Sequence, residues 1–179
     1  VAKGVGLAVG ALGGLVVGSA VALGMFVKAH VQALEAQIKF GQRLGIAIDR
    51  LQALHVAAKL AGVDIQQLNI GMQRMGRRVA EAAQGLGEAQ GALKELGIDA
   101  KVLSRLSIDR QFLAIADAMG AVKTRGDQVR LTFKLFDSEG VSVINMLDMG
   151  AERLGRIMQF AQKIGATIDE DTARGVSRT

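Results

Sequence analysis

Cysteine, proline, tryptophan and tyrosine are all absent from this chain of 179 residues. Without cysteine the protein has no disulfide bond and no thiolate metal ligand. Without proline no helix is kinked by a residue that lacks a backbone N–H, and the chain is rich in alanine, leucine, glutamine and arginine, which favour helices. No stretch alternates between apolar and polar residues as a half-buried strand would. We therefore expect an all-α protein.

Residues that usually carry chemistry are also scarce. The two histidines, His30 and His55, fall on separate expected helices and cannot assemble a metal cluster. The acidic pair Asp169 and Asp171 stands at an expected helix start, where capping and the helix dipole explain it. No serine has the sequence context of a nucleophile elbow. We expect no catalytic, cofactor or metal site, and a protein that is not an enzyme.

The charge is basic, with a formal net charge of +5 and both signs interspersed along the chain. One tight basic cluster stands out, formed by Arg74, Arg77 and Arg78. It could contact an anionic partner, either DNA without sequence specificity or anionic lipid. The common alternative for such a cluster is a solvated helix face, and the lack of tryptophan and tyrosine removes the usual base-stacking platform.

A stripe of small residues marks the N-terminal part of the chain. Gly6, Gly10, Gly14 and Gly18 stand four apart, and Ala22 continues the series. Residues four apart share one face of a helix, so this face would let a second helix approach closely, as in small-xxx-small packing. Each glycine costs ~1 kcal/mol against alanine inside a helix, so a close packing partner is the expected reason for the repeat.

The same segment is uncharged from residue 4 to residue 27. As a helix it would span about 36 Å, which is enough to cross a hydrocarbon layer of ~30 Å. It is rich in glycine and alanine and lacks interfacial tryptophan, so we expect it to enter a membrane only as an oligomer or to pack inside protein. The alternatives are a buried hairpin in a soluble core and a cleaved signal peptide. The apolar run past Ala20-Val21-Ala22 disfavours the signal peptide.

The pattern divides the chain into three parts. A long Gly-rich apolar N-terminal helix covers residues 1–44, a compact array of short helices covers 45–172, and 173–179 form a frayed tail. The short helices are separated by a glycine, an apolar residue and a capping residue. This device occurs at Gly62-Val63-Asp64, Gly97-Ile98-Asp99 and Gly165-Ala166-Thr167, and more loosely from Gly45 to Asp49. Glycine ends one helix in the left-handed conformation, and Asp or Thr caps the next.

The expected short helices differ in the strength of their patterns. The clearest covers 65–83, with a stripe formed by Ile65, Leu68, Met72, Met75, Val79 and Ala82. Further helices are expected over 88–95, 100–106, 108–122, 126–136, 140–149 and 151–164. Val129, Phe133 and Phe136 would form the buried face of the helix over 126–136. The segment 84–91, AQGLGEAQG from residue 83 onward, is the best linker candidate.

The order of these segments resembles the phage tail tape measure proteins over residues 42–172. The carrying segments are GQRLGIAIDRLQALHVAAKLAGVDIQQLNIGMQRMGRRVAEAAQG, LKELGIDAKVLSRLSIDRQFLAIADAM and VRLTFKLFDSEGVSVINMLDMGAERL. The short markers are Leu96-Gly97-Ile98, Leu135-Phe136, Gly140 and Gly150-Ala151-Glu152. The chain departs from the family pattern at Asp137, where a glycine is common after Leu-Phe.

The resemblance implies a structural protein packed in several copies in the lumen of a virion tail. Such proteins are made in the host cytoplasm, set the length of the tail tube, and leave it on infection to help the genome cross the host inner membrane. The implied partners are further copies of the chain, tail tube and tail tip proteins, that membrane and, without specificity, DNA. Family members are much longer than this chain, so we expect it to be a piece of one.

Short helices broken by glycine corners fold compactly, so they cannot be an efficient ruler, and the measuring coiled coil would lie elsewhere. Two further functions remain open beside the resemblance. A membrane-inserting toxin or pore-forming effector would share the glycine stripe and the short helices. Neighbouring tail genes would favour the tape measure, and an immunity gene would favour the toxin. A helical DNA-binding module is the other possibility, with a steep salt dependence.

Overall fold

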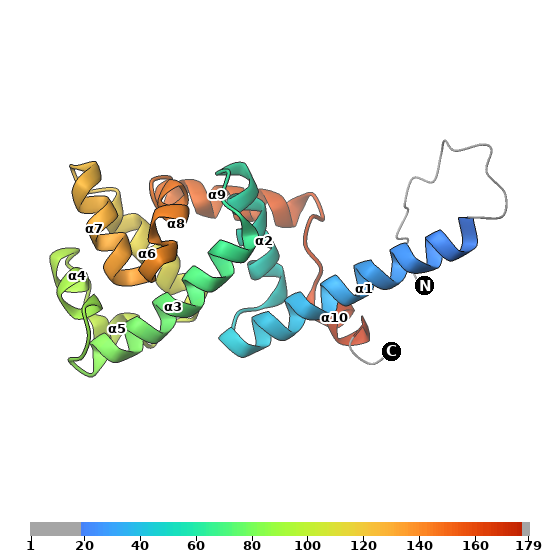
Figure 1. Ribbon diagram of the computed structural model, residues 1–179, viewed down its shortest axis with the longest axis horizontal. Helices are drawn as coiled ribbons and strands as arrows, with labels where there is room; N and C mark the ends of the chain where they lie inside the picture. Colours follow the sequence, from blue (N-terminus) through green and yellow to red (C-terminus); the bar gives the residue numbers. More distant parts are fainter. Residues whose placement is uncertain (1–18, 177–179) are drawn as a thin grey trace.

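The computed structural model describes residues 19–176 of the chain (Figure 1). The described residues do not include Gly6, Gly10, Gly14 or Gly18. Ala22 lies in the first helix. Over residues 19–176 every regular element is helical, in agreement with the expected all-α class. The elements are α1 Ser19–Leu44, α2 Ile48–Leu60, α3 Ile65–Ala83, α4 Ala89–Glu95, α5 Ala100–Leu103, α6 Ile108–Met119, α7 Arg125–Phe136, the 3₁₀ turn η1 Asp137–Glu139, α8 Gly140–Leu147, α9 Gly150–Lys163 and α10 Glu170–Val176.

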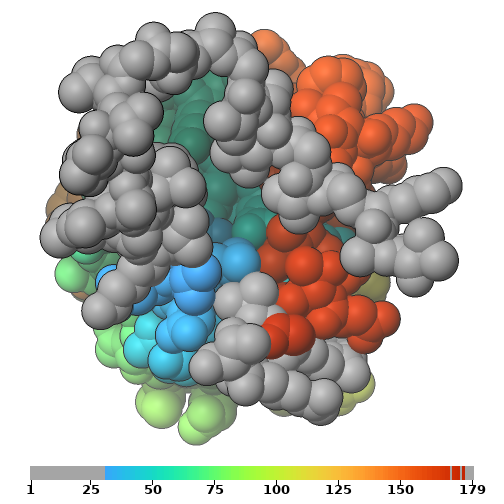
Figure 2. Space-filling model, turned by 90° about the vertical axis from the view of Figure 1, so that its right-hand side faces the viewer, coloured from blue at the N-terminus to red at the C-terminus, as the bar shows by residue number. Residues whose placement is uncertain are grey.

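The first helix is long and extends away from the other helices (Figure 1). It ends at Leu44, as the sequence predicts, where Gly45 takes a φ of 65°. Its later part packs on α2 and α10, and Figure 2 shows residues of α1 beside the red C-terminal residues. Among residues 19–176 no helix is both long and apolar enough to pass through a bilayer.

The glycine corners have the geometry that the sequence predicts. Gly45, Gly62, Gly97 and Gly165 all have φ between 65° and 71°. In each case the apolar residue after the glycine donates its backbone N–H across the last turn of the preceding helix, as in a Schellman motif. These bonds are Ile46 N to Gly41 O at 2.9 Å, Val63 N to Ala58 O at 2.8 Å, Ile98 N to Leu93 O at 2.8 Å and Ala166 N to Ala161 O at 2.9 Å.

Two of the expected caps are present and one is replaced. The Asp64 carboxylate accepts from the backbone N–H of Gln66 and Gln67, and Asp99 caps α5 in the same way. The cap expected at Thr167 is wrong, because α10 begins only at Glu170. Asp169 takes the role and accepts from the N–H of Thr172 at 2.7 Å. This hydrogen bond lowers the pKa of Asp169 below its ordinary value.

The core is organised around α3, which has the bounds predicted from its periodicity. Its buried stripe of Leu68, Met72, Met75 and Val79 is fully enclosed. Helices α4, α5, α6, α7 and α8 all pack against it. Phe112 and Phe136 meet edge to face beside it, with ring centroids 5.9 Å apart. This helix is therefore the axis on which α4 to α8 assemble, whereas α9 packs on α2 and α6.

The buried face predicted for α7 is partly wrong. Phe136 is buried, but Phe133 is 48% exposed, and Leu131, Thr132 and Leu135 are buried instead. The reason is the close approach of α8: a Cβ at Gly140 would lie 2.6 Å from the carbonyl carbon and oxygen of Thr132. Contact at Thr132 turns Phe133, one position further round the helix, toward the surface. The Thr132 hydroxyl is satisfied within its own helix by Gln128 O and Val129 O.

Two further expectations about the connections hold only in part. Residues 84–88 of the expected linker 84–91 do connect α3 to α4, but α4 begins at Ala89, which is 1% exposed and packed in the core. The expected fraying after Thr172 is not observed in the described part of the tail, where α10 continues to Val176 and Ala173 is buried. In both places an alanine enters the core, and alanine has too small an apolar surface to stand out in a sequence.

The corners give the first testable prediction. Gly62→Ala should lower the free energy of unfolding by about 1–2 kcal/mol, because a side chain is strained at its φ of 70° even though no atom lies within 4 Å of the added Cβ. Gly155→Ala is the matched control, since this glycine lies in the open middle of α9. It should stabilise the protein by about 0.5–1 kcal/mol. Urea denaturation of both variants checks this, and equal shifts would contradict the assignment of the corner.

Candidate interaction surfaces

The cluster of Arg74, Arg77 and Arg78 lies on α3, and carboxylates already face each of the three side chains. Arg74 pairs with Glu139 at 2.5 Å and more loosely with Asp137 at 3.5 Å. Arg78 pairs with Asp137 at 3.1 Å and donates to the backbone carbonyl of Lys134 at 2.8 Å. These bonds join α3 to η1 and to the end of α7.

The third arginine is paired within its own helix. Arg77 donates to Glu81 one turn along, at 3.1 Å. An incoming phosphate would therefore have to displace a carboxylate at Arg74, Arg77 and Arg78 alike. The contact with an anionic partner stays a prediction for these residues, while the observed geometry gives Arg74 and Arg78 a role in holding the fold together.

The centre of this ion-pair network is a residue with unusual backbone geometry. Asp137 has φ 62° and ψ −144°, a region that is nearly restricted to glycine. It is the position where the resemblance predicts glycine. Partial burial raises the pKa of its carboxyl, but the charges of Arg78 and Arg74 and the hydrogen bond from Arg78 outweigh burial and lower the pKa overall. The ion pairs thus favour aspartate at a position whose backbone disfavours it.

His55 lies inside the fold. It is 5% exposed, and its Nε2 lies 2.8 Å from Oδ1 of Asn69 on α3. Burial lowers the pKa of His55 most, the bond to Asn69 opposes this shift, and nearby Lys59 adds to it. No group of three His, Cys, Asp or Glu side chains suited to a metal ion occurs within the described residues. His55 therefore has the environment of a packed, hydrogen-bonded histidine.

A glutamine next to this histidine ties both ends of the described chain to α2. Gln52 donates to Gln37 of α1 at 3.2 Å, and its Oε1 accepts the backbone N–H of Ile168 at 2.8 Å. Gln37, Gln52, His55 and Lys59 line a small polar groove of about 170 Å³. No sequence signal predicts this junction, because neither glutamine belongs to a motif.

A partly buried ion pair was likewise missed by sequence reasoning. Asp109, in the first turn of α6, is 1% exposed and pairs with Arg50 of α2. An Asp in a first helical turn is ordinarily explained by the helix dipole, and that explanation hides its tertiary role. The cross-helix pair holds α6 against α2, and it has the geometry of a structural contact.

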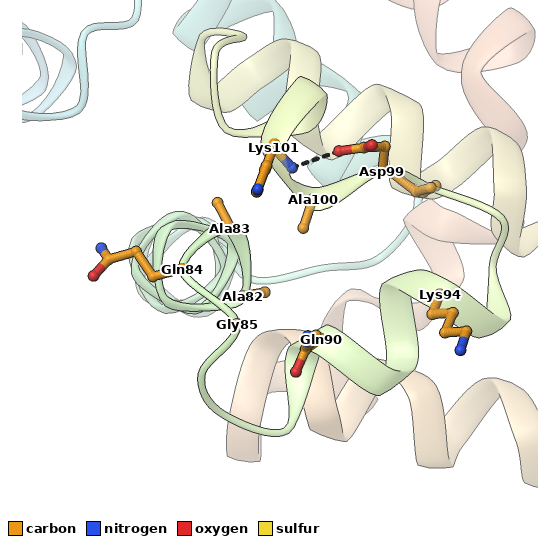
Figure 3. A pocket seen from close by; sticks show the side chains of 10 residues that line it. Ala82, Ala83, Gln84, Gly85, Gln90, Lys94, Asp99, Ala100 and Lys101 are labelled. Carbon is orange, nitrogen blue, oxygen red and sulfur yellow. Dashed lines mark hydrogen bonds between the residues drawn. The ribbon is translucent and has the colours of Figure 1, made fainter.

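A groove of about 620 Å³ opens where the end of α3 meets α4 and α5 (Figure 3). Lys101 of α5 points toward the end of α3, and Lys94 lies across the groove on α4. The walls consist mainly of alanine, glycine and glutamine residues, with Ile98 and Asp99 at the corner before α5. This surface combines positive charge with small apolar residues.

Comparison with protein-family models, with curated proteins and with solved structures gives no match to this chain.

A pair of substitutions at Asp137 tests the balance between backbone strain and ion pairing. Asp137→Asn keeps a side chain at the strained φ and removes the charge, so it should lower the melting temperature. Asp137→Gly loses the same charge but relieves the strain, so it should melt above Asp137→Asn. Thermal unfolding by circular dichroism at neutral pH measures the order.

The pH dependence of the Asp137 variants is a second readout. Because the pKa of Asp137 is lowered in the folded state, the stability from its ion pairs is present at neutral pH and is lost as the pH falls below about 3.8. The gap between wild type and Asp137→Asn should close in that range. The exposed Asp117→Asn should have little effect at either pH, and the same effect at both aspartates would contradict a special role for Asp137.

The lowered pKa of His55 predicts a change in stability nearer neutral pH. A folded-state pKa below the ordinary 6.5 means that the unfolded chain binds the proton more readily, so stability is full above pH 6.5 and falls as the pH drops below it. His55→Gln should reduce the loss of unfolding free energy between about pH 7.5 and about pH 5.5. Urea titrations at the two pH values measure this. His30→Gln is the control, and an equal reduction there would remove the assignment to His55.

Proposed function

We propose that this chain is the compact part of a phage tail tape measure protein together with its membrane-active N-terminal segment. The protein would be carried in the tail lumen and released to help the genome pass the host inner membrane. The proposal rests on the order of sequence blocks over residues 42–172. One observation supports it most: Asp137, the departure from the family pattern, takes a backbone conformation suited to the glycine expected there.

The arrangement of α1 is consistent with this role. Helix α1 begins directly after the glycine stripe and extends away from the short helices (Figure 1). A helix of its length spans about 39 Å, whereas the elements after it fold back on one another. The short helices therefore suit a domain carried by the tape, and the ruler function would belong to other parts of a longer protein.

The glycine stripe is the part of the proposal that concerns self-association. Gly6, Gly10, Gly14 and Gly18 would let neighbouring copies of the N-terminal segment pack backbone to backbone. Bulky side chains at these positions would hold two helices apart and would remove the van der Waals contacts that drive association. The apolar remainder of the segment would then meet lipid without a helical partner.

The first experiment asks whether the chain belongs to a tail. Mass spectrometry of purified tailed particles from a host carrying this gene should detect its peptides, and emptied particles should have lost them. Full particles without these peptides would overturn the proposal. Release of the protein from cells in the absence of particles would instead favour the toxin alternative.

The second experiment concerns the stripe. Gly10→Leu with Gly14→Leu should abolish chemical cross-linking between copies in detergent and reduce infectivity at least about tenfold, the effect of losing roughly 1.4 kcal/mol of packing. Ala8→Leu with Ser19→Leu is the matched control, because helical spacing places these two small residues on the face opposite Gly10. Equal cross-linking and infectivity in the two double variants would show that the stripe has no packing role.

A further inference from the structure

One short helical turn presents an unusual combination of side chains to solvent. After α5 the chain continues as a helical turn, because Arg105 N donates to Val102 O at 3.2 Å and Leu106 N to Leu103 O at 3.0 Å. Leu103 points into the core, whereas Lys101, Val102, Arg105 and Leu106 are exposed. These four residues are called the basic-apolar corner below.

Helical spacing orders the corner into two neighbouring stripes. Lys101 and Arg105 are four apart and share one face, and Val102 and Leu106 form the adjacent one. Val102 is 61% exposed, so its side chain is left in water by the fold itself. Lys94 adds a third positive charge across the groove that Lys101 lines (Figure 3).

The carboxylates nearest in sequence are occupied elsewhere. Glu95 is held by Arg130 at 2.5 Å, and this hydrogen bond lowers the pKa of Glu95. Asp99 turns its carboxylate to the backbone N–H groups of Lys101 and Val102, and Asp109 is buried against Arg50. Among the residues that the structure describes, neither Lys101 nor Arg105 forms a salt bridge. The positive charge of the corner is therefore left for an external partner.

We propose that the basic-apolar corner docks on the surface of a bilayer that carries anionic headgroups. Lys101, Arg105 and Lys94 would lie among the headgroup phosphates. Val102 and Leu106 would enter the boundary between headgroups and acyl chains, where cationic and apolar side chains of one helix are accommodated together. The positive charges favour an anionic surface over a neutral one. The exposed side chains of Val102 and Leu106 favour lipid over a purely polar partner.

Nucleic acid fits the corner less well. A phosphodiester backbone would satisfy Lys101 and Arg105 but would leave Val102 and Leu106 in water, with no release of hydration. The corner also has no aromatic side chain on which a base could stack. The Arg74–Arg78 cluster, which the sequence singles out as the basic surface, is filled by its own carboxylates, so the corner is the stronger site for anionic lipid.

The absence of tryptophan and tyrosine from the chain makes a direct test possible. A tryptophan introduced by Val102→Trp would be the sole strong fluorophore. Its emission should shift to the blue on adding vesicles of phosphatidylglycerol mixed with phosphatidylcholine, and it should not shift with phosphatidylcholine alone. Val141→Trp is the matched control, because Val141 is similarly exposed on α8. No shift at residue 102, or equal shifts at both positions, would overturn the proposal.

The charges are tested in the full chain by vesicle flotation. Lys101→Gln with Arg105→Gln should lower the partition coefficient onto phosphatidylglycerol vesicles roughly 30-fold, about fivefold for each cation removed near an anionic surface. Lys123→Gln with Arg153→Gln removes the same charge from other exposed positions and should change partitioning much less. Equal losses in the two double variants would overturn the proposal.

Two further readouts distinguish lipid binding from nucleic-acid binding and from a loss of folding. A short DNA duplex is titrated in parallel, and a loss of DNA binding without a loss of vesicle binding would assign the corner to nucleic acid and overturn the proposal. Circular dichroism verifies that the exposed substitutions leave the fold intact, and Lys101→Gln alone is the milder variant. The glycine stripe is unchanged in all of these proteins, so the outcome is independent of the tape measure proposal.

Discussion

Left-handed glycines at the helix ends are the constraint on which the rest of this fold depends. At Gly45, Gly62, Gly97 and Gly165 the chain leaves a helix with positive φ. At the first three corners the next residue, Ile46, Val63 or Ile98, packs in the core or against it, whereas Ala166 after Gly165 stays exposed. The corners keep the helices after α1 short enough to pack around α3. Without them, a proline-free chain of helix-forming residues would favour longer rods. Compactness here is a property of the turns as much as of the apolar stripes.

Sequence reasoning located most of the helices because their signals are local. The stripe from Leu68 to Val79 and the caps at Asp64 and Asp99 need no knowledge of the rest of the molecule. It failed where a distant contact decides the outcome. Phe133 is exposed because Gly140 brings α8 onto the neighbouring Thr132, and this register between two helices is not encoded in the periodicity of either one.

The candidate surfaces show the same difference between what local sequence signals predict and what distant contacts decide. The sequence identified Arg74, Arg77 and Arg78 as a basic cluster, but only the tertiary structure places Asp137 and Glu139 beside Arg74 and Arg78. Conversely, Lys101 and Arg105 are unremarkable in the sequence, since Asp99 and Asp109 stand near them. They become a positive surface because folding engages those carboxylates in a helix cap and a partly buried pair. Summing the formal charges of a sequence segment therefore mispredicts the available positive charge, both at the Arg74–Arg78 cluster and at Lys101 and Arg105.

The junction at Gln52 has a mechanical consequence. Helix α1 and the segment that leads into α10 attach to α2 through the same side chain, and α1 and α10 lie side by side (Figure 2). A force applied between the two ends of the described chain would therefore act first on these hydrogen bonds and on the packing of α1 and α10 against α2. Tension would peel α10 and α1 away while the helices around α3 remain folded. The helices around α3 would separate from α1 and α10 as a folded unit before they themselves unfold.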